Sequence, residues 1–347
     1  MPSYKDKSGK WYVKFYYTDH QGKRKQKLKR GFDLKRQADE FERNFLTDIE
    51  STRKLDDDLL LPFDKFVDIF LIHKRQINAA SSNQTDKYTF KNHIYGAFQK
   101  PISEITKPEL QNWTNSLVNK DMGLVQIRKI YIAMRSVFNY AERVYGLTPN
   151  PVKGLIPPKK REAPTEMQFW TIKEFKTAIQ AISDIKARTA ITVLFYTGLR
   201  KGELYALTWD DYQGDYISID KSLQKIEGEI VVTPPKTMSS IRKILMPSQV
   251  KDALNTWRPY TTGERIFEWE KRFIEKGIQE AHEKTGVKRI RVHDLRHSHA
   301  SYLISKGANI ELISKRLGHA KTSMTMDIYG HLYPSDEIKL IHLIESE

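Results

Sequence analysis

The chain has 347 residues, more than one domain usually holds, so we expect two or three units that each bury a core. Its 58 Lys and Arg against 43 Asp and Glu give a net charge of +15, which favours a polyanionic partner, nucleic acid before an anionic membrane surface. No apolar run approaches the ~20 residues that cross a bilayer, and the N-terminus lacks the apolar stretch of a signal peptide. We therefore expect a soluble, cytoplasmic protein without a membrane partner. The absence of cysteine excludes disulfides and thiol chemistry.

Basic residues are concentrated at the N-terminus, where residues 1–36 contain 12 Lys and Arg and 3 Asp. Aromatic and β-branched side chains at 10–18, turn-forming residues at 19–22 and a basic run at 23–30 predict a β-hairpin. Four lysines at period two share one face of its second strand, and a two-stranded ribbon fits the major groove of DNA. They are Lys23, Lys25, Lys27 and Lys29. We predict that they contact DNA, the alternative being a solvated edge strand that lysines protect.

A helix is expected to follow this hairpin, over residues 34–50. Ala38, Phe41, Phe45 and Ile49 have the spacing that covers one face of a sheet. The predicted N-terminal unit, residues 1–55, is therefore a β-hairpin or three-stranded sheet packed against one helix.

Residues 62–145 are typical of helices and contain no good strand candidates. Thr106 and Glu109 form a capping-box pattern that begins a helix ending near Val118. Another helix, over 124–144, has an apolar stripe beside basic Arg128, and Gly146 follows its end. We expect a helical unit at 60–155.

Prolines and basic residues then form a stiff connector, which we place at residues 156–168. This basic, proline-rich composition favours a linker that lies along DNA. Lys159 and Lys160 in this connector, together with Arg128, are therefore candidate DNA contacts.

The remaining residues, 169–347, mix helices and short strands. Thr171 and Glu174 repeat the capping-box pattern, and an apolar helix covers 190–196. Strand candidates lie at 216–219, 229–233 and 242–246, and helices follow. The predicted fold class is multi-domain and mainly α with small β elements, and this third unit is α+β.

Four ordered motifs in the third unit carry residues suited to phosphate chemistry. Gly198-Leu199-Arg200-x-x-Glu203-Leu204 places an arginine after a glycine, at an expected junction between two helices. His293-x-x-Arg296 sets two side chains three residues apart, so on a helix they share a face and can converge on one anion. Leu317-Gly318-His319 adds an imidazole, and Tyr329 adds a phenol.

In these motifs the chain resembles the tyrosine recombinase (phage integrase) family, specifically over about residues 171–333. The resemblance implies a catalytic domain at 169–347, an arm-type DNA-binding domain at 1–55 and a helical, SAM-like core-binding domain at 60–155. It also implies that tyrosine attacks a phosphate surrounded by cationic and imidazole groups, with a lysine from a β-hairpin and a supporting glutamate. The implied residues are Arg200, Lys236, His293, Arg296, His319 and Tyr329, supported by Glu203.

The chemistry needs these residue types. The transition state of phosphodiester displacement carries added negative charge on the non-bridging oxygens, and the planar forks of Arg200 and Arg296 can each bind two oxygens. The phenol of Tyr329 has an ordinary pKa of ~10, so a base is needed, and His293 is our candidate. Lys236 is the expected acid for the 5′-hydroxyl leaving group. His319 is expected to hydrogen-bond the phosphate.

A phosphotyrosine bond retains most of the energy of the broken phosphodiester, so no cofactor, metal or ATP is required. We therefore predict a site-specific recombinase that acts through a 3′-phosphotyrosine intermediate and integrates and excises the DNA of a phage or other mobile element. Its expected partners are double-stranded DNA with core and arm-type sites, three further copies in a tetramer, an excisionase and a host DNA-bending protein. We expect it in the cytoplasm, associated with the nucleoid.

Other interpretations account for part of the pattern. Histidines at 293, 297, 299, 319 and 331 could indicate a metal-dependent nuclease, although Arg296 lies inside that set and two-metal carboxylates are missing. We predict that His297 and His299 are structural. A non-catalytic DNA-binding architectural or regulatory protein fits the composition, and a type IB topoisomerase would share the chemistry.

Two features of the C-terminal part remain open. Tyr302 and Tyr333 are alternative nucleophiles, of which Tyr302 is predicted to lie in the core. Residues 335–347 are spaced for an amphipathic helix, which could pack on its own domain or on a neighbouring protomer.

Overall fold

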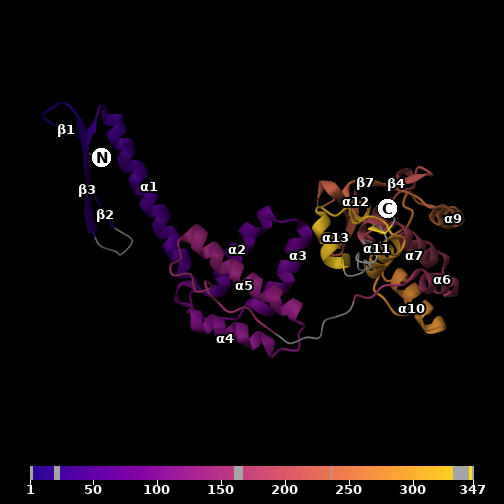
Figure 1. The fold of residues 1–347 in the computed structure, drawn as a ribbon. Helices are drawn as coiled ribbons and strands as arrows, with labels where there is room; N and C mark the ends of the chain where they lie inside the picture. Colours follow the sequence, from indigo (N-terminus) through magenta and orange to yellow (C-terminus); the bar gives the residue numbers. More distant parts are fainter. Residues whose placement is uncertain (1–2, 19–23, 160–166, 236, 331–343, 346–347) are drawn as a thin grey trace. The chain divides into compact units, whose positions relative to one another are not determined.

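The structure is a computed structural model that describes residues 3–18, 24–159, 167–235, 237–330 and 344–345, with the backbone alone at 48–56. The chain forms two compact units, Met1–Ala163 and Pro164–Glu347. Figure 1 shows a small sheet and mainly helical parts. This agrees with the predicted fold class, mainly α with small β elements.

The N-terminal sheet has three antiparallel strands in the order β1-β2-β3, which are Ser3–Lys5, Trp11–Thr18 and Arg24–Phe32. The pairing of β2 with β3 confirms the predicted hairpin, whose turn lies outside the described residues. Helix α1, Lys35–Leu59, packs on one face through Ala38, Phe41 and Phe45, as predicted, while the side chain of Ile49 lies outside the described residues. The helix is longer than the sequence indicated.

The strand register decides which face of this sheet carries each basic residue. Lys29, Lys27 and Lys25 are opposite Val13, Phe15 and Tyr17, so the three lysines share the face on which α1 packs. The ammonium of Lys27 lies 5.1 Å from the centre of the Phe45 ring of α1. The period-two pattern is therefore present, but on the helix-covered side of the sheet, and Lys23 lies outside the described residues.

Between α1 and the connector, the described residues form helices and no β-strand, as predicted. They are α2 (Phe63–Ile77), α3 (Ala80–Thr89) with a π-helical extension (Phe90–Ile94), a short 3-10 helix (Ile102–Glu104), α4 (Lys107–Val118) and α5 (Leu124–Tyr145). The expected capping box forms where the backbone N–H of Thr106 donates to the Glu109 carboxylate at 2.9 Å. The apolar stripe of α5 is buried against α2 and α4, so Arg128 remains exposed.

The second unit is built around α7 (Ile185–Thr197), which is buried on nearly every side. The other helices are α6 (Ile172–Ala181), α8 (Lys201–Ala206), α9 (Ser248–Trp257), α10 (Phe273–Thr285), α11 (Asp294–Ser305), α12 (Ile310–Leu317) and α13 (Thr322–Tyr329). Thr171 caps α6 through Glu174, as predicted. Thus helices from both halves of the unit surround α7.

Four short strands complete this unit. They are β4 (Tyr216–Ile219), β5 (Ser222–Ile226), β6 (Glu229–Thr233) and β7 (Arg242–Leu245), paired as β4-β7 and β5-β6. The sequence predicted three of them and missed β5. Because β6 and β7 flank residues 234–241, these strands fix the two ends of the segment that contains Lys236, which itself lies outside the described residues.

No described helix is long and apolar enough to cross a membrane. The predicted C-terminal helix at 335–347 falls almost entirely outside the described residues.

Candidate active site

The first arginine lies where α7 turns into α8. Gly198 ends α7 with a left-handed backbone (φ 68°), and a Cβ on it would lie 2.7 Å from both the His299 ring and Leu317. Only glycine therefore allows this turn. The next residues place Arg200 at the start of α8, with its side chain 38% exposed.

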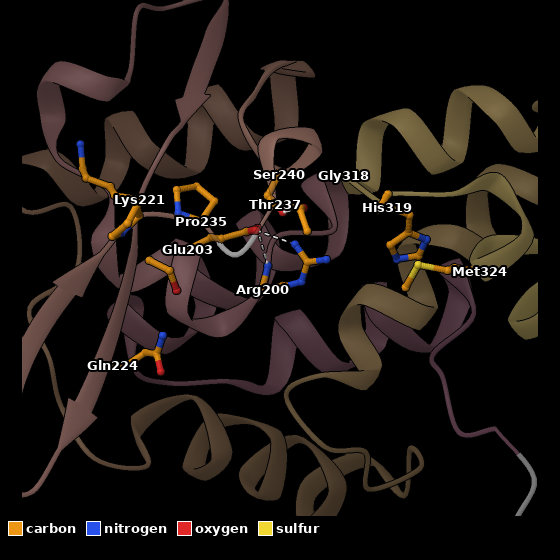
Figure 2. A pocket seen from close by; sticks show the side chains of 13 residues that line it. Arg200, Glu203, Lys221, Gln224, Pro235, Thr237, Ser240, Gly318, His319 and Met324 are labelled. Atoms are coloured by element: carbon orange, nitrogen blue, oxygen red, sulfur yellow. Dashed lines mark hydrogen bonds and ion pairs between the residues drawn. The ribbon is translucent and has the colours of Figure 1, made fainter. Parts of the chain in front are cut away.

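Glu203, one turn after Arg200, is in direct contact with it. The Glu203 carboxylate accepts the Arg200 guanidinium at 2.8 Å and the Arg200 backbone N–H at 2.9 Å. Figure 2 shows this pair at the cavity edge. The Glu203 side chain is 5% exposed, and the Arg242 and Arg200 guanidiniums hold the pKa of its carboxyl below the usual value in spite of burial. The carboxylate is therefore ionised and available as a brace.

Arg242, a residue that the sequence analysis missed, ties three segments together. It binds both oxygens of Glu203, at 2.9 and 3.2 Å, and donates to the backbone carbonyls of Ser240 and Arg316. The Arg242 side chain also lies close to Gly318, where an added Cβ would be 3.1 Å from a guanidinium nitrogen of Arg242. This buried arginine therefore couples the Arg200 turn, the segment after residue 236 and the turn before His319. Its place at the start of a strand gave no signal for such a role.

Arg296 is buried within the same cluster. Only 3% of it is exposed, and it donates to the carbonyls of Gly198 and Leu317, both at 2.7 Å. These carbonyls lie two residues before Arg200 and two residues before His319. Burial and the charge of Arg200 lower the pKa of Arg296 to about 9, so it stays protonated at neutral pH. One guanidinium thus joins three of the four sequence motifs.

A cavity of about 270 Å³ opens beside these groups and contains Arg200 and His319 in its lining. Figure 2 shows His319 facing Arg200 across it, with Pro235 and Thr237 from the segment between β6 and β7 along another side. The residues on both sides of Lys236 therefore line the same cavity as Arg200. The Nδ1 of His319 lies 2.7 Å from the Thr325 hydroxyl, and burial and Arg296 lower the pKa of His319 to about 4.

Tyr329, the last residue of α13, is 1% exposed. Its hydroxyl lies 2.7 Å from Nδ1 of His297, one turn after His293 on α11. Burial raises the pKa of Tyr329 to about 12, opposed only in part by the positive charge of Arg296. His293 packs edge-on against His297, with ring centres 5.3 Å apart, and burial lowers its pKa. The predicted nucleophile thus contacts a histidine that we had expected to be structural.

The other histidine and tyrosine predictions concern packing. His299 is buried between the Phe195 carbonyl, 2.8 Å from its Nδ1, and the Arg316 guanidinium, which donates to its Nε2 at 3.2 Å. This is the structural environment that we predicted. Tyr302, predicted to lie in the core, is partly buried and packs against the core residue Phe195. Within the described residues, no three His, Asp or Glu side chains come together as metal ligands would, and His331 and Tyr333 lie outside that range.

Comparisons with known proteins identify the family of this chain. Family models match three stretches: the arm DNA-binding domain at 2–49, the phage integrase N-terminal SAM-like domain at 63–118 and the phage integrase family at 168–336. The ICEBs1 integrase of Bacillus subtilis (strain 168) is 30% identical over 308 residues, which cover 79% of this chain and 80% of that protein. The chain belongs to the phage integrase family. It is therefore a tyrosine recombinase, a DNA-binding enzyme that breaks and rejoins DNA strands.

Two further matches are more distant. A XerC-like tyrosine recombinase of Caldanaerobacter subterraneus subsp. tengcongensis is 24% identical to this chain over 295 residues, which cover 74% of each protein. The solved structure of a lambda integrase tetramer bound to a Holliday junction matches with a TM-score of 0.60 at 17% identity, covering 93% of this chain and 97% of that one. The structural match shows the shared fold.

The remaining predicted DNA contacts are scattered. Arg128 on α5 and Lys159 in the connector are exposed, while Lys160 lies outside the described residues. Their part in DNA binding stays a prediction.

Proposed function

We propose that this integrase cleaves and rejoins DNA by forming a 3′-phosphotyrosine bond at Tyr329. The observation that carries the proposal is the arrangement of four groups from separate motifs. Arg296 donates to the carbonyls two residues before Arg200 and two residues before His319, and its charge acts on Tyr329. Arg200 and His319, which line the cavity, would bind the phosphate that the phenol attacks.

The assigned roles follow from charge and protonation. Arg200 keeps a half-exposed guanidinium that can bind the non-bridging oxygens, whereas Arg296 is fixed by two carbonyls and presents its charge from within the protein. His319, neutral at physiological pH because its pKa is lowered, can hydrogen-bond the phosphate. Lys236 remains our candidate for the acid that protonates the leaving 5′-oxygen, since its neighbours Pro235 and Thr237 line the cavity.

The biological setting is proposed from the relatives. A match over most of the chain to an integrase named for the element ICEBs1 supports integration and excision of a mobile element. The lambda integrase tetramer on a Holliday junction supports assembly of four copies on double-stranded DNA. An excisionase, a host DNA-bending protein, and a location in the cytoplasm at the nucleoid remain predictions of the same proposal.

For the arm domain, we propose that DNA binds the sheet face opposite α1. On this face Arg24 lies 4.7 Å from the ring centre of Tyr16, and Arg30 lies 5.7 Å from that of Tyr12. Tyr12, which is partly buried, also stacks on the exposed Tyr4, so this face carries aromatic rings together with guanidiniums. Such a face combines charge for phosphates with flat groups for the groove, whereas the lysine face is covered in part by α1.

The central test uses a nicked suicide DNA substrate without added metal, followed by denaturing electrophoresis. The integrase is expected to form a covalent adduct, and Tyr329→Phe is expected to form none. Tyr302→Phe is the matched control, because it removes a phenol from the same unit without touching the cluster. An adduct that persists in Tyr329→Phe, or that Tyr302→Phe abolishes, would overturn the assignment.

A further inference from the structure

The contact between Tyr329 and His297 raises the question of where the tyrosine proton goes. We propose that His297, through Nδ1, is the base that removes this proton during cleavage and returns it during rejoining. The inference rests on the proposed role of Tyr329 as nucleophile. It replaces His293, our candidate from the sequence and the N-cap residue of α11, with the histidine one turn later on that helix.

The geometry favours His297 for this task. Its Nδ1 lies 2.7 Å from the Tyr329 hydroxyl, which is within reach for direct proton transfer. In the described part of the chain, no hydrogen bond joins His293 to this hydroxyl, and the His293 ring instead meets His297 edge-on. Tyr329 is almost fully buried, and His297 is the group whose ring nitrogen lies within hydrogen-bond distance of its hydroxyl.

A base is needed because the cationic cluster alone does not ionise the phenol. Burial raises the pKa of Tyr329 to about 12, and the opposing effect of Arg296 is smaller. Burial also lowers the pKa of His297 to about 4, so its imidazole is neutral and can accept. At rest the proton stays on tyrosine. The resting enzyme therefore holds a neutral pair, which costs less in a buried site than a phenolate.

Proton transfer becomes favourable only as the new bond forms. As the Tyr329 oxygen attacks phosphorus, its electron pair enters the O–P bond and its basicity falls, so the proton moves to Nδ1. The P–O5′ bond breaks in the same step, and the departing oxygen takes a proton from the leaving-group acid. The products are the phosphotyrosine, an imidazolium at His297 and a free 5′-hydroxyl. Rejoining reverses each transfer.

Two substitutions separate this role from simple support of the tyrosine. His297→Asn places an amide near the position of Nδ1, where it can hydrogen-bond the hydroxyl but cannot accept its proton. His297→Ala removes both functions. If His297 is the base, both variants slow adduct formation in single-turnover assays by about 100-fold or more. Near-normal cleavage by His297→Asn would reduce His297 to a positioning residue, and normal cleavage by His297→Ala would remove any role.

A modified substrate distinguishes removal of the tyrosine proton from protonation of the leaving 5′-oxygen. Sulfur in place of the bridging 5′-oxygen leaves without protonation, so it should restore cleavage to Lys236→Ala but not to either His297 variant. Restoration of the His297 variants would place this histidine at the leaving group and overturn the proposal. His282→Asn, which changes a histidine that contacts the Val287 carbonyl, is the matched control and should cleave normally.

Binding to an uncut site and thermal unfolding are measured for every variant, so that a folding defect is recognised. If Tyr329 were not the nucleophile, Tyr329→Phe would still form an adduct, and this result differs from any outcome of the His297 variants.

Discussion

Charged groups lie in opposite environments in the arm sheet and in the catalytic cluster. In the sheet, arginines and most lysines are exposed, and their near neighbours are the rings of Tyr12, Tyr16 and Phe45. In the catalytic unit, Arg242 and Arg296 are buried, and each is held by carbonyl or carboxylate oxygens from distant segments. Both regions bind an anion in our proposal, yet only the second fixes the positions of its charges.

The difference follows from what each region has to do. The affinity for DNA depends on how many positive charges lie near phosphates, and the exact position of each charge matters little. A transition state is stabilised most by charges that are already fixed in place, because they need no rearrangement during the reaction. We therefore expect single substitutions to have large effects in the cluster and small ones on the sheet.

The largest effect is expected for Arg296→Lys. An ammonium cannot donate to the Gly198 and Leu317 carbonyls in the planar geometry of the guanidinium, so the turns that carry Arg200 and His319 lose a shared support. We expect adduct formation to fall by about 100-fold to 1,000-fold, the range for loss of one fixed donor. If Arg296→Lys kept normal adduct formation, a positive charge at this position would suffice and its fixed geometry would not matter. Gel-shift affinity for the core site serves as the control.

A smaller effect is expected for Arg242→Met, measured first as stability. The substitution leaves the Glu203 carboxylate buried with Arg200 as its remaining charged partner, and breaking such a pair costs about 3 kcal/mol. Chemical denaturation measures this loss, and the single-turnover rate should fall with it.

The double variant Arg242→Met with Glu203→Gln tests the cause. Removing the buried negative charge should recover part of the lost stability. If the two changes are simply additive, the ion pair is not the reason for the loss.

The smallest effects are expected on the arm sheet, where two pairs of substitutions remove equal charge from opposite faces. Arg24→Gln with Arg30→Gln changes the open face, and Lys25→Gln with Lys29→Gln changes the face that α1 shares. We expect the arginine pair to weaken binding of arm-type DNA. The slope of the logarithm of the binding constant against the logarithm of the salt concentration should fall by about one per lost phosphate contact. The lysine pair should do less.

Binding titrations at several salt concentrations measure both pairs. A larger loss for the lysine pair would return the DNA contact to the face predicted from the sequence.

The sequence by itself determined the elements and the chemical inventory of this integrase. Capping boxes at Thr106 and Thr171 begin helices where predicted, because such caps are local and depend on residues three apart. The motifs around Arg200, Arg296 and Tyr329 likewise identified groups that the structure gathers, because they resemble the motifs of the family.

Only the tertiary structure decided how these groups meet. The lysine row could be assigned to one face of a strand but not to the face that α1 covers, because period two does not distinguish the two sides of a sheet. Arg242 and His297 gave no signal of their own. Their partners, Glu203 and Tyr329, are 39 and 32 residues away, and such contacts arise only when separate helices and strands pack together.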